Sequence, residues 1–187
     1  MRKYQSYFHV DQSGRKKRYE GSQTWIGLHP QVLQTPYSEI LTIFQTIKRF
    51  KPESIVDIGA GYGRLGIVSS SFFPEASFTG FEIIEQRLEE AKRMFEELEL
   101  GNCKMVQEDL SLESFTPPKA DVYFIYDFSD PLDIRKILRQ ICEVNAGRET
   151  LVVAKGEFIQ PIIKKTHPEF ISVFPGSTKR AWDIFQL

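Results

Sequence analysis

The residues best suited to chemistry in this sequence are one aspartate and the glycines that follow it. Asp57 ends an apolar stretch, and glycine then occupies every second position from Gly59 to Gly63. Glycine allows a sharp turn and leaves no Cβ between the main chain and a ligand. A helix expected from residue 64 would point its free N–H groups and the positive end of its dipole at this turn. The strand, loop and helix therefore predict a site for a nucleotide-like cofactor.

Two kinds of cofactor compete for this loop. Gly61, Gly63 and Gly66 satisfy the G-x-G-x-x-G of dinucleotide-binding proteins, and Glu82 stands where a ribose-binding acid belongs. The carboxylate of Asp57 argues against a pyrophosphate, because the repulsion would cost on the order of 1 kcal/mol at an effective dielectric of about 20. A cofactor that carries an ammonium and a sulfonium group would be attracted instead. An NAD-binding oxidoreductase is therefore the less favoured alternative.

The elements around the loop alternate between strand and helix. Apolar residues recur at three- and four-residue steps in the expected helices, and the strands lack regular polar alternation. Pro161 is expected to break the segment after the fifth strand. The pattern predicts strands over 54–58, 77–82, 103–107, 122–126, 150–155, 170–174 and 181–186, and helices over 37–50, 64–72, 84–100 and 131–144. This series predicts an α/β fold: a doubly wound seven-stranded sheet, mostly parallel with a C-terminal antiparallel hairpin, flanked by helices on both faces.

The glycine loop and its surroundings resemble one large enzyme family. Val56-Asp57-Ile58-Gly59-Ala60-Gly61-Tyr62-Gly63 is similar to the first motif of the class I (Rossmann-like) S-adenosylmethionine-dependent methyltransferases, and the likeness covers roughly residues 35–187. The resemblance implies S-adenosylmethionine as the cofactor and a methyltransferase domain over 35–187. Residues 1–34 would then form an N-terminal extension and a candidate cap over the substrate.

The resemblance also assigns residues to the cofactor. Glu82 would bind the ribose hydroxyls, and Asp109 or Glu108 would accept a hydrogen bond from the adenine amino group. Ile83 would pack on the adenine face, although it could equally be a core residue. Tyr37 or Thr35 would close over the methionine carboxylate, although Thr35 could equally cap the helix that follows. The expected cofactor-binding residues are Tyr37, Asp57, Gly59, Ala60, Gly61, Gly63, Glu82, Ile83, Asp109 and Leu110.

The candidate catalytic residues follow the fourth strand. Asp127 is placed to accept a proton from an amine that attacks the methyl group, with Tyr126 and Phe128 as aromatic walls. Asp130 is the alternate acid, but Asp130-Pro131 is typical of a helix start. The Asn/Asp-Pro-Pro-Tyr/Phe signature of amino-methylating nucleic-acid enzymes is absent, because Phe128-Ser129 replaces the prolines.

The sequence does not identify the methyl acceptor. A protein amine such as lysine and RNA are the two leading classes, and a small molecule is third. A methyltransferase-like binding module without turnover is a further alternative. Residues 1–34 carry six basic against two acidic side chains, so this basic arm would contact an anionic partner or form a solvated loop.

Composition places the chain in the cytoplasm, away from membranes. No tract among its 187 residues is long and apolar enough to cross a bilayer, and the N-terminus lacks the apolar core of a secretory signal. Cys103 and Cys142 are expected to be buried thiols in a reducing compartment. No histidine has a metal partner at ligand spacing in the sequence, so no metal is expected.

Overall fold

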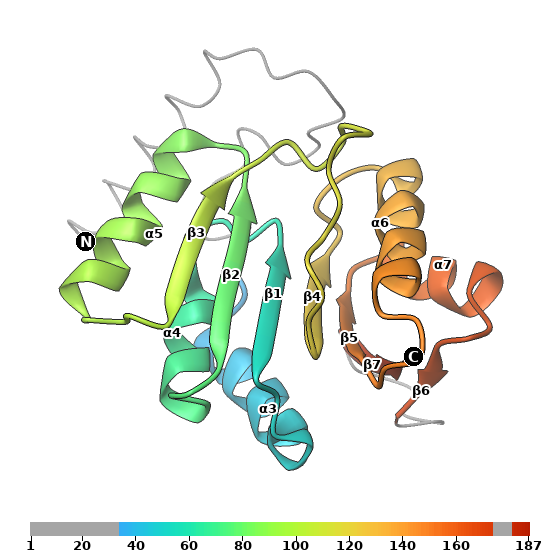
Figure 1. Ribbon diagram of the computed structural model, residues 1–187, viewed down its shortest axis with the longest axis horizontal. Coiled ribbons are helices and arrows are strands. Elements are labelled where there is room, and N and C mark those ends of the chain that lie inside the picture. The colour runs from blue at the N-terminus through green and yellow to red at the C-terminus, as the bar shows by residue number, and fades with distance from the viewer. Residues whose placement is uncertain (1–33, 174–180) are drawn as a thin grey trace.

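The computed structural model describes residues 34–173 and 181–187 of the chain. The fold is built on one β-sheet. Its seven strands are β1 (Ser54–Ile58), β2 (Ser77–Glu82), β3 (Cys103–Gln107), β4 (Val122–Tyr126), β5 (Leu151–Lys155), β6 (Ile171–Ser172) and β7 (Trp182–Gln186), all within the described residues. They lie in the order β3-β2-β1-β4-β5-β7-β6 (Figure 1). The first five pair in parallel, whereas β7 runs antiparallel to β5 and β6. The predicted fold class is confirmed.

The strand order reverses direction between β1 and β4. From β1 the chain proceeds outward to β2 and β3, and it then returns to place β4 on the other side of β1. In such sheets the loops that leave the two central strands diverge and open a crevice at their carboxyl ends. The glycine loop follows β1 and the candidate catalytic residues follow β4, so the topology brings both groups to this crevice.

Helices cover both faces of the sheet. On one face lie α3 (Tyr37–Ile47) with the 3-10 turn η1 (Lys48–Phe50), α4 (Arg64–Phe72) and α5 (Glu85–Glu97). On the other face lie α6 (Pro131–Val144) and α7 (Ile159–Thr166) (Figure 1). Successive strand residues point to opposite faces, so Ile55 joins the first core and Val56 the second.

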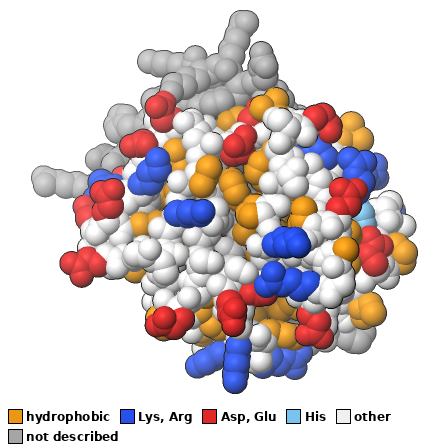
Figure 2. Space-filling model, viewed as in Figure 1, with side chains coloured by type: hydrophobic (Ala, Val, Ile, Leu, Met, Phe, Trp, Pro, Cys, Tyr) orange, Lys and Arg blue, Asp and Glu red, His pale blue; other side chains and the backbone are white. Residues whose placement is uncertain are grey.

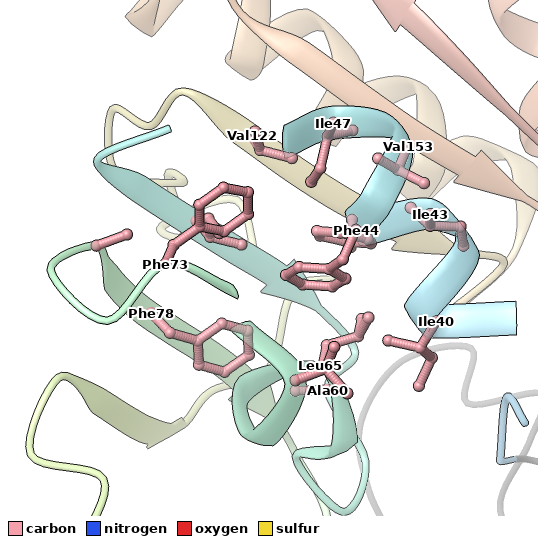
Figure 3. Close-up of a cluster of buried hydrophobic side chains, with 14 of the residues drawn as sticks. Ile40, Ile43, Phe44, Ile47, Ala60, Leu65, Phe73, Phe78, Val122 and Val153 are labelled. Atoms are coloured by element: carbon pink, nitrogen blue, oxygen red, sulfur yellow. The ribbon is translucent and has the colours of Figure 1, made fainter. Parts of the chain in front are cut away.

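The core under α3 fixes the position of that helix. Phe44 of α3 stacks on Phe124 of β4, with ring centroids 5.3 Å apart and planes 12° apart. Figure 3 shows Phe44 amid Phe73, Phe78 and Val122. Aromatic pairs of this kind contribute about 0.5–1.5 kcal/mol beyond the area that they bury. This packing holds the segment before α3 beside the carboxyl edge of the sheet.

Two helices end differently from the sequence prediction. The helix expected over 37–50 changes to a 3-10 turn at Lys48, and Lys51 adopts a left-handed φ of 47°. Pro52 causes this ending, since a proline disfavours the α conformation in the residue before it. The helix expected over 84–100 spans only Glu85–Glu97, because Glu99 is left-handed with φ 54°.

The prediction that Pro161 breaks the chain was wrong, because Pro161 lies inside α7. It is the third residue of the helix, where a backbone N–H has no intrahelical acceptor and a proline is tolerated. The carboxylate of Asp127 accepts hydrogen bonds from the N–H groups of Phe158 (2.9 Å) and Ile159 (3.0 Å). The start of α7 is therefore held by a residue from the loop after β4.

The predicted antiparallel pair at the C-terminal end is confirmed, with shorter strands. β6 contains only Ile171 and Ser172, which pair with Gln186 and Phe185 of β7. The connection over 174–180 lies outside the described residues, as does nearly all of the basic arm. Among the helices that the structure describes, none combines the length and apolar character needed to cross a membrane.

Candidate active site

A cavity of about 580 Å³ opens at the carboxyl edge of the central strands. Its walls come from the glycine loop, the end of β2, the β4–α6 loop, the end of β5 and the residues before α3. These segments lie far apart in the sequence and meet only at the point where the strand order reverses. The cavity is therefore the expected crevice of a doubly wound sheet.

The glycine loop follows a path that side chains would obstruct. Gly59 has a φ of +83°, and a Cβ there would lie 2.7 Å from Cβ of Phe128. Gly61 has a φ of +55° with open space around its missing side chain. Gly63 caps α4 with φ +70°, and a Cβ there would meet the ring of Phe95 at 2.9 Å. Gly59 and Gly61 therefore keep the loop thin at the cavity, whereas Gly63 serves the packing between helices.

Glu82 is held rigidly at the end of β2. Its Oε2 accepts the N–H of Gly61 at 2.8 Å, and its Oε1 accepts the N–H of Ile84 at 2.9 Å. Burial raises the pKa of this carboxyl group, while the positive charge of Arg87 and these N–H groups oppose the rise. An ionised carboxylate offers about four acceptor sites, so the group can also accept a hydrogen bond from a hydroxyl in the cavity.

Asp57 brings a second buried carboxyl group into the cavity. The residue is 3% exposed and lies in the cavity lining. Burial raises its pKa well above the usual range, and the negative charge of Glu82 adds to the rise. A positively charged group in the cavity would oppose this rise in pKa, because it would favour the ionised form. The pair of acids therefore suits a ligand with a cationic part and hydroxyl groups.

Tyr126 offers a polar atom without a protein partner. Its hydroxyl is buried and has no hydrogen-bond partner among the described residues. Burial raises its pKa well above the usual value, and the charges of Asp57 and Glu39 raise it further. A buried group left unpaired costs about 1–3 kcal/mol. A ligand in the cavity could supply the missing partner, so the residues present fit a bound cofactor.

Asp127 lines the cavity and also forms hydrogen bonds with another part of the chain. Its backbone has a φ of +28°, and both carboxylate oxygens accept N–H groups at the start of α7. Gly156 packs so closely that a Cβ there would lie 2.1 Å from Cγ of Asp127. These contacts indicate that Asp127 positions the β4–α6 loop and α7. Its role as a proton acceptor stays a prediction.

The family model described as a methyltransferase domain matches residues 50–176. This chain belongs to that methyltransferase family. The predicted membership of a methyltransferase family is therefore confirmed. A search of curated proteins found no match to the methyltransferase.

Solved structures share its fold at low sequence identity. YcgJ from Bacillus subtilis is 21% identical, with a TM-score of 0.51 over 64% of this chain and 51% of YcgJ. A SAM-dependent methyltransferase from Aquifex aeolicus is 12% identical, with a TM-score of 0.54 over 82% and 98%. Magnesium protoporphyrin IX methyltransferase (ChlM) from Synechocystis PCC 6803, solved with bound SAM, is 17% identical, with a TM-score of 0.55 over 80% and 79%. The methyltransferase thus spans about half the length of YcgJ.

Most residues predicted to bind the cofactor line the cavity of the methyltransferase. Those that do are Asp57, Gly59, Ala60, Gly61, Glu82, Ile83 and Leu110, and the predicted catalytic residues Tyr126, Asp127 and Phe128 join them. Thr35 and Glu108, which were the alternatives to Tyr37 and Asp109, also lie in the lining. Asp130 instead caps α6, with its Oδ1 accepting N–H groups of Leu132 and Asp133.

Tyr37, Gly63 and Asp109 are not in the lining of the methyltransferase cavity. Tyr37 is 42% exposed, and its ring lies under the guanidinium of Arg64 at 4.6 Å. Asp109 turns to its own loop, where Oδ1 accepts the N–H of Ser111 at 3.0 Å and its hydroxyl at 2.6 Å. The side chains of Thr35 and Glu108 are therefore better placed for the two roles.

Two cationic residues of the lining escaped the sequence analysis. Arg64 begins α4, and its Nη1 donates to the carbonyl oxygen of Thr35 at 3.1 Å. Arg87 is buried in the first turn of α5, where its charge lowers the pKa of Glu82 against the effect of burial. The sequence feature that could have revealed both residues is a basic side chain within one turn of each expected helix start. In the methyltransferase these cations balance part of the acidic charge at the cavity.

Proposed function

We propose that this protein transfers the methyl group of S-adenosylmethionine to an amine of a protein side chain. The observation that carries the proposal is the pair of buried carboxyl groups, Asp57 and Glu82, at a cavity beside a glycine turn. When bound, S-adenosylmethionine supplies an electrophilic methyl group on a sulfonium. The protein's task is then to orient the two reactants and to exclude water.

The chain's own residues divide between the two ends of such a cofactor. Glu82 would accept hydrogen bonds from the ribose hydroxyls, and Asp57 would face the cationic methionine part. Ile83 and Leu110 supply apolar surface for the adenine, and Glu108 supplies an acceptor for its amino group. The hydroxyl of Tyr126, unpaired among the described residues, would bond to a polar atom of a bound reactant.

The charges around the cavity favour an amine over a nucleic acid as the acceptor. Glu108, Glu157 and Asp127 lie in the lining, while the ammonium of Lys155 is paired with Glu39 at 2.6 Å. Acidic groups attract a lysine ammonium and repel phosphates. Figure 2 shows Lys and Arg side chains interspersed with Asp and Glu on the face toward the viewer, without a broad basic patch.

RNA is the second candidate because of the basic arm, whose residues 1–34 carry a net charge of +4. An arm of that charge would add a phosphate-binding segment to the acidic cavity. RNA association through the arm should weaken steeply with added salt. A protein acceptor should show a much flatter salt response.

Cofactor binding can be tested by calorimetric titration with S-adenosylhomocysteine. The wild type should bind one equivalent, and Asp57→Asn should weaken binding at least about tenfold, which corresponds to about 1.4 kcal/mol. Glu89→Gln is the matched control, because Glu89 lies on the exposed side of α5 with a side chain 66% exposed. Binding of NADH but not of S-adenosylhomocysteine would contradict the proposal.

The acceptor class can be tested with radiolabelled S-adenosylmethionine and a fractionated lysate. Label is expected in the protein fraction, sensitive to protease and resistant to ribonuclease. Label that ribonuclease removes would assign RNA instead. Cofactor binding without any transferred label would support the non-catalytic binding module.

A further inference from the structure

A cysteine, a histidine and a glutamate meet on the sheet face opposite α3, away from the cavity lining. Cys142 lies in the last turn of α6, His167 follows the last residue of α7, and Glu169 lies two residues further on. Their ligand atoms, one from each side chain, all lie within 4.8 Å of one another. α6 and α7 pack together here (Figure 1). None of the three residues lines the proposed active site.

Glu169 stands between the other two residues. Its Oε1 lies 2.8 Å from Nδ1 of His167 and 3.3 Å from Sγ of Cys142. A thiol nucleophile would need the order Cys–His–acid, with the imidazole next to the sulfur. Here the carboxylate is the shared neighbour, so this cluster is not arranged for nucleophilic catalysis. Three ligand atoms of these types within 4.8 Å of one another are close enough to share one cation.

The chain holds two of the three groups in place without any ligand. The N–H of His167 donates to the carbonyl oxygen of Ile163 at 3.0 Å, and the N–H of Phe170 donates to that of His167 at 3.1 Å. These bonds close a turn that contains Pro168, whose φ is fixed. The His167 ring packs edge-on against Phe170, with centroids 6.0 Å apart, and its side chain is 12% exposed. His167 and Glu169 are therefore presented by a stiff turn.

We infer that Cys142, His167 and Glu169 bind one divalent transition-metal ion, with zinc as the preferred occupant. Sγ, Nδ1 and one carboxylate oxygen would be the ligands, and water would complete a tetrahedron. Ligand atoms of tetrahedral zinc lie about 3.5 Å apart, given Zn–S of about 2.3 Å and Zn–N of about 2.0 Å. The Sγ–Oε1 separation of 3.3 Å is already close to that value, whereas the Nδ1–Oε1 contact of 2.8 Å would have to widen to admit the ion.

The ligand types decide which ion fits. Thiolate and imidazole ligands suit zinc and its neighbours and exclude magnesium and calcium, which take oxygen ligands. The thiol proton of Cys142 leaves to solvent on binding. Thiolate and carboxylate then carry two negative charges, which a divalent ion neutralises. The bound ion would tie the end of α6 to the turn after α7.

The test is a titration of the reduced, chelator-treated full-length chain with Co²⁺ as a spectroscopic probe for zinc. One equivalent should give the visible bands of tetrahedral cobalt and a thiolate-to-cobalt charge-transfer band. Cys142→Ser should remove the charge-transfer band. Cys103→Ser is the matched control, because Cys103 is also half-buried but lies on β3, and it should retain the band. A wild type without the band, or a Cys142→Ser variant that keeps it, would overturn the inference.

A second measurement guards against loss of structure in the variants. Zn²⁺ should raise the unfolding temperature of the wild type and Cys103→Ser, but not of Cys142→Ser. His167→Asn should weaken zinc affinity at least about tenfold, since even changes outside the ligand set cost about 10- to 100-fold. Equal zinc stabilisation of all four proteins would place the ion elsewhere on the chain.

Discussion

The ammonium group of Lys136 donates a hydrogen bond to the carbonyl oxygen of Leu110 at 2.7 Å, linking α6 to a wall of the active-site cavity. The same ammonium donates to the carbonyl oxygen of Leu112 at 2.8 Å, and Lys136 itself is buried. The loop after β3 has no strand or helix of its own at this point. Lys136 therefore holds the segment around Leu110 that is expected to contact the adenine.

Lys136→Met should loosen this wall. Methionine keeps most of the side-chain volume but leaves two carbonyl oxygens without their donor, so the free energy of unfolding should fall by about 1–3 kcal/mol. Affinity for S-adenosylhomocysteine should fall several-fold in a calorimetric titration. Arg139→Met is the control, because Arg139 lies on the exposed side of α6 in a long contact of 3.9 Å with Glu143. Unchanged affinity in Lys136→Met would limit the lysine to a role in folding.

Asp57→Asn should make the ligand-free protein more stable at neutral pH and flatten its pH dependence. Burial, and secondly Glu82, raise the pKa of Asp57 in the folded state above the usual 3.8. Between that value and the raised one the folded state binds more protons than the unfolded state, so stability falls as pH rises. The Asp57→Asn substitution removes the titrating carboxyl group and therefore this fall in stability. Thermal unfolding of both proteins across pH 4–8 would test it, and parallel curves would contradict the prediction.

Tyr126→Phe should leave the ligand-free fold intact while weakening function. The Tyr126 hydroxyl has no hydrogen-bond partner among the described residues, so its removal should not lower the unfolding temperature. Tyr123→Phe is the matched control on the same strand. Its hydroxyl accepts a hydrogen bond from Nδ2 of Asn145 at 2.9 Å, so stability should fall without a change in cofactor affinity. Identical behaviour of the two variants would disprove the assignment of Tyr126 to the site.

Asp127→Ala should lower the unfolding temperature by about 4–8 °C. Two N–H groups at the start of α7 lose their acceptor, a loss of about 2 kcal/mol, and each 1 kcal/mol is worth about 2–4 °C at this chain length. Asp130→Ala removes a comparable cap from α6 and serves as the comparison. If Asp127 also takes the proton of the methyl-accepting amine, only Asp127→Ala should lose methyl transfer at temperatures where both variants are folded. Equal residual activity would leave Asp127 a positioning residue.

Gly59→Ala should abolish cofactor binding and destabilise the fold. Alanine would be strained at φ +83°, and its Cβ would collide with Phe128 at 2.7 Å. Gly101→Ala is the contrast, since Gly101 has neither a positive φ nor an atom within 4 Å of the added carbon. Circular dichroism melts and a titration with S-adenosylhomocysteine would separate the two. A stable Gly59→Ala that binds normally would refute the role given to this turn.

The parts of the site that could be predicted are those fixed by backbone position. Asp57 and Glu82 end neighbouring parallel strands, so the strand pattern alone places them at one edge of the sheet. The glycine turn follows from residue type, because few other residues accept its positive φ angles. The fold class follows from the same alternation of elements.

The parts that could not be predicted depend on side-chain direction and on distant partners. Asp109 and Glu108 are adjacent, and only the hydrogen bonds to Ser111 decide which of them turns away from the cavity. The spacing of apolar residues did not predict α7. The start of this helix is held by Asp127, which lies more than 30 positions earlier in the sequence. The pairing of Lys136 with the β3 loop has no local signal either.

The short helix α7 has a different neighbour at each end. Its first N–H groups are bound by Asp127 in the cavity lining, and its last turn leads directly into His167. Eight residues of helix form a rod of about 12 Å, too short to bend appreciably. Displacement at one end must therefore be transmitted to the other, and zinc added to the metal-free protein should slow amide hydrogen exchange at Phe158 and Ile159.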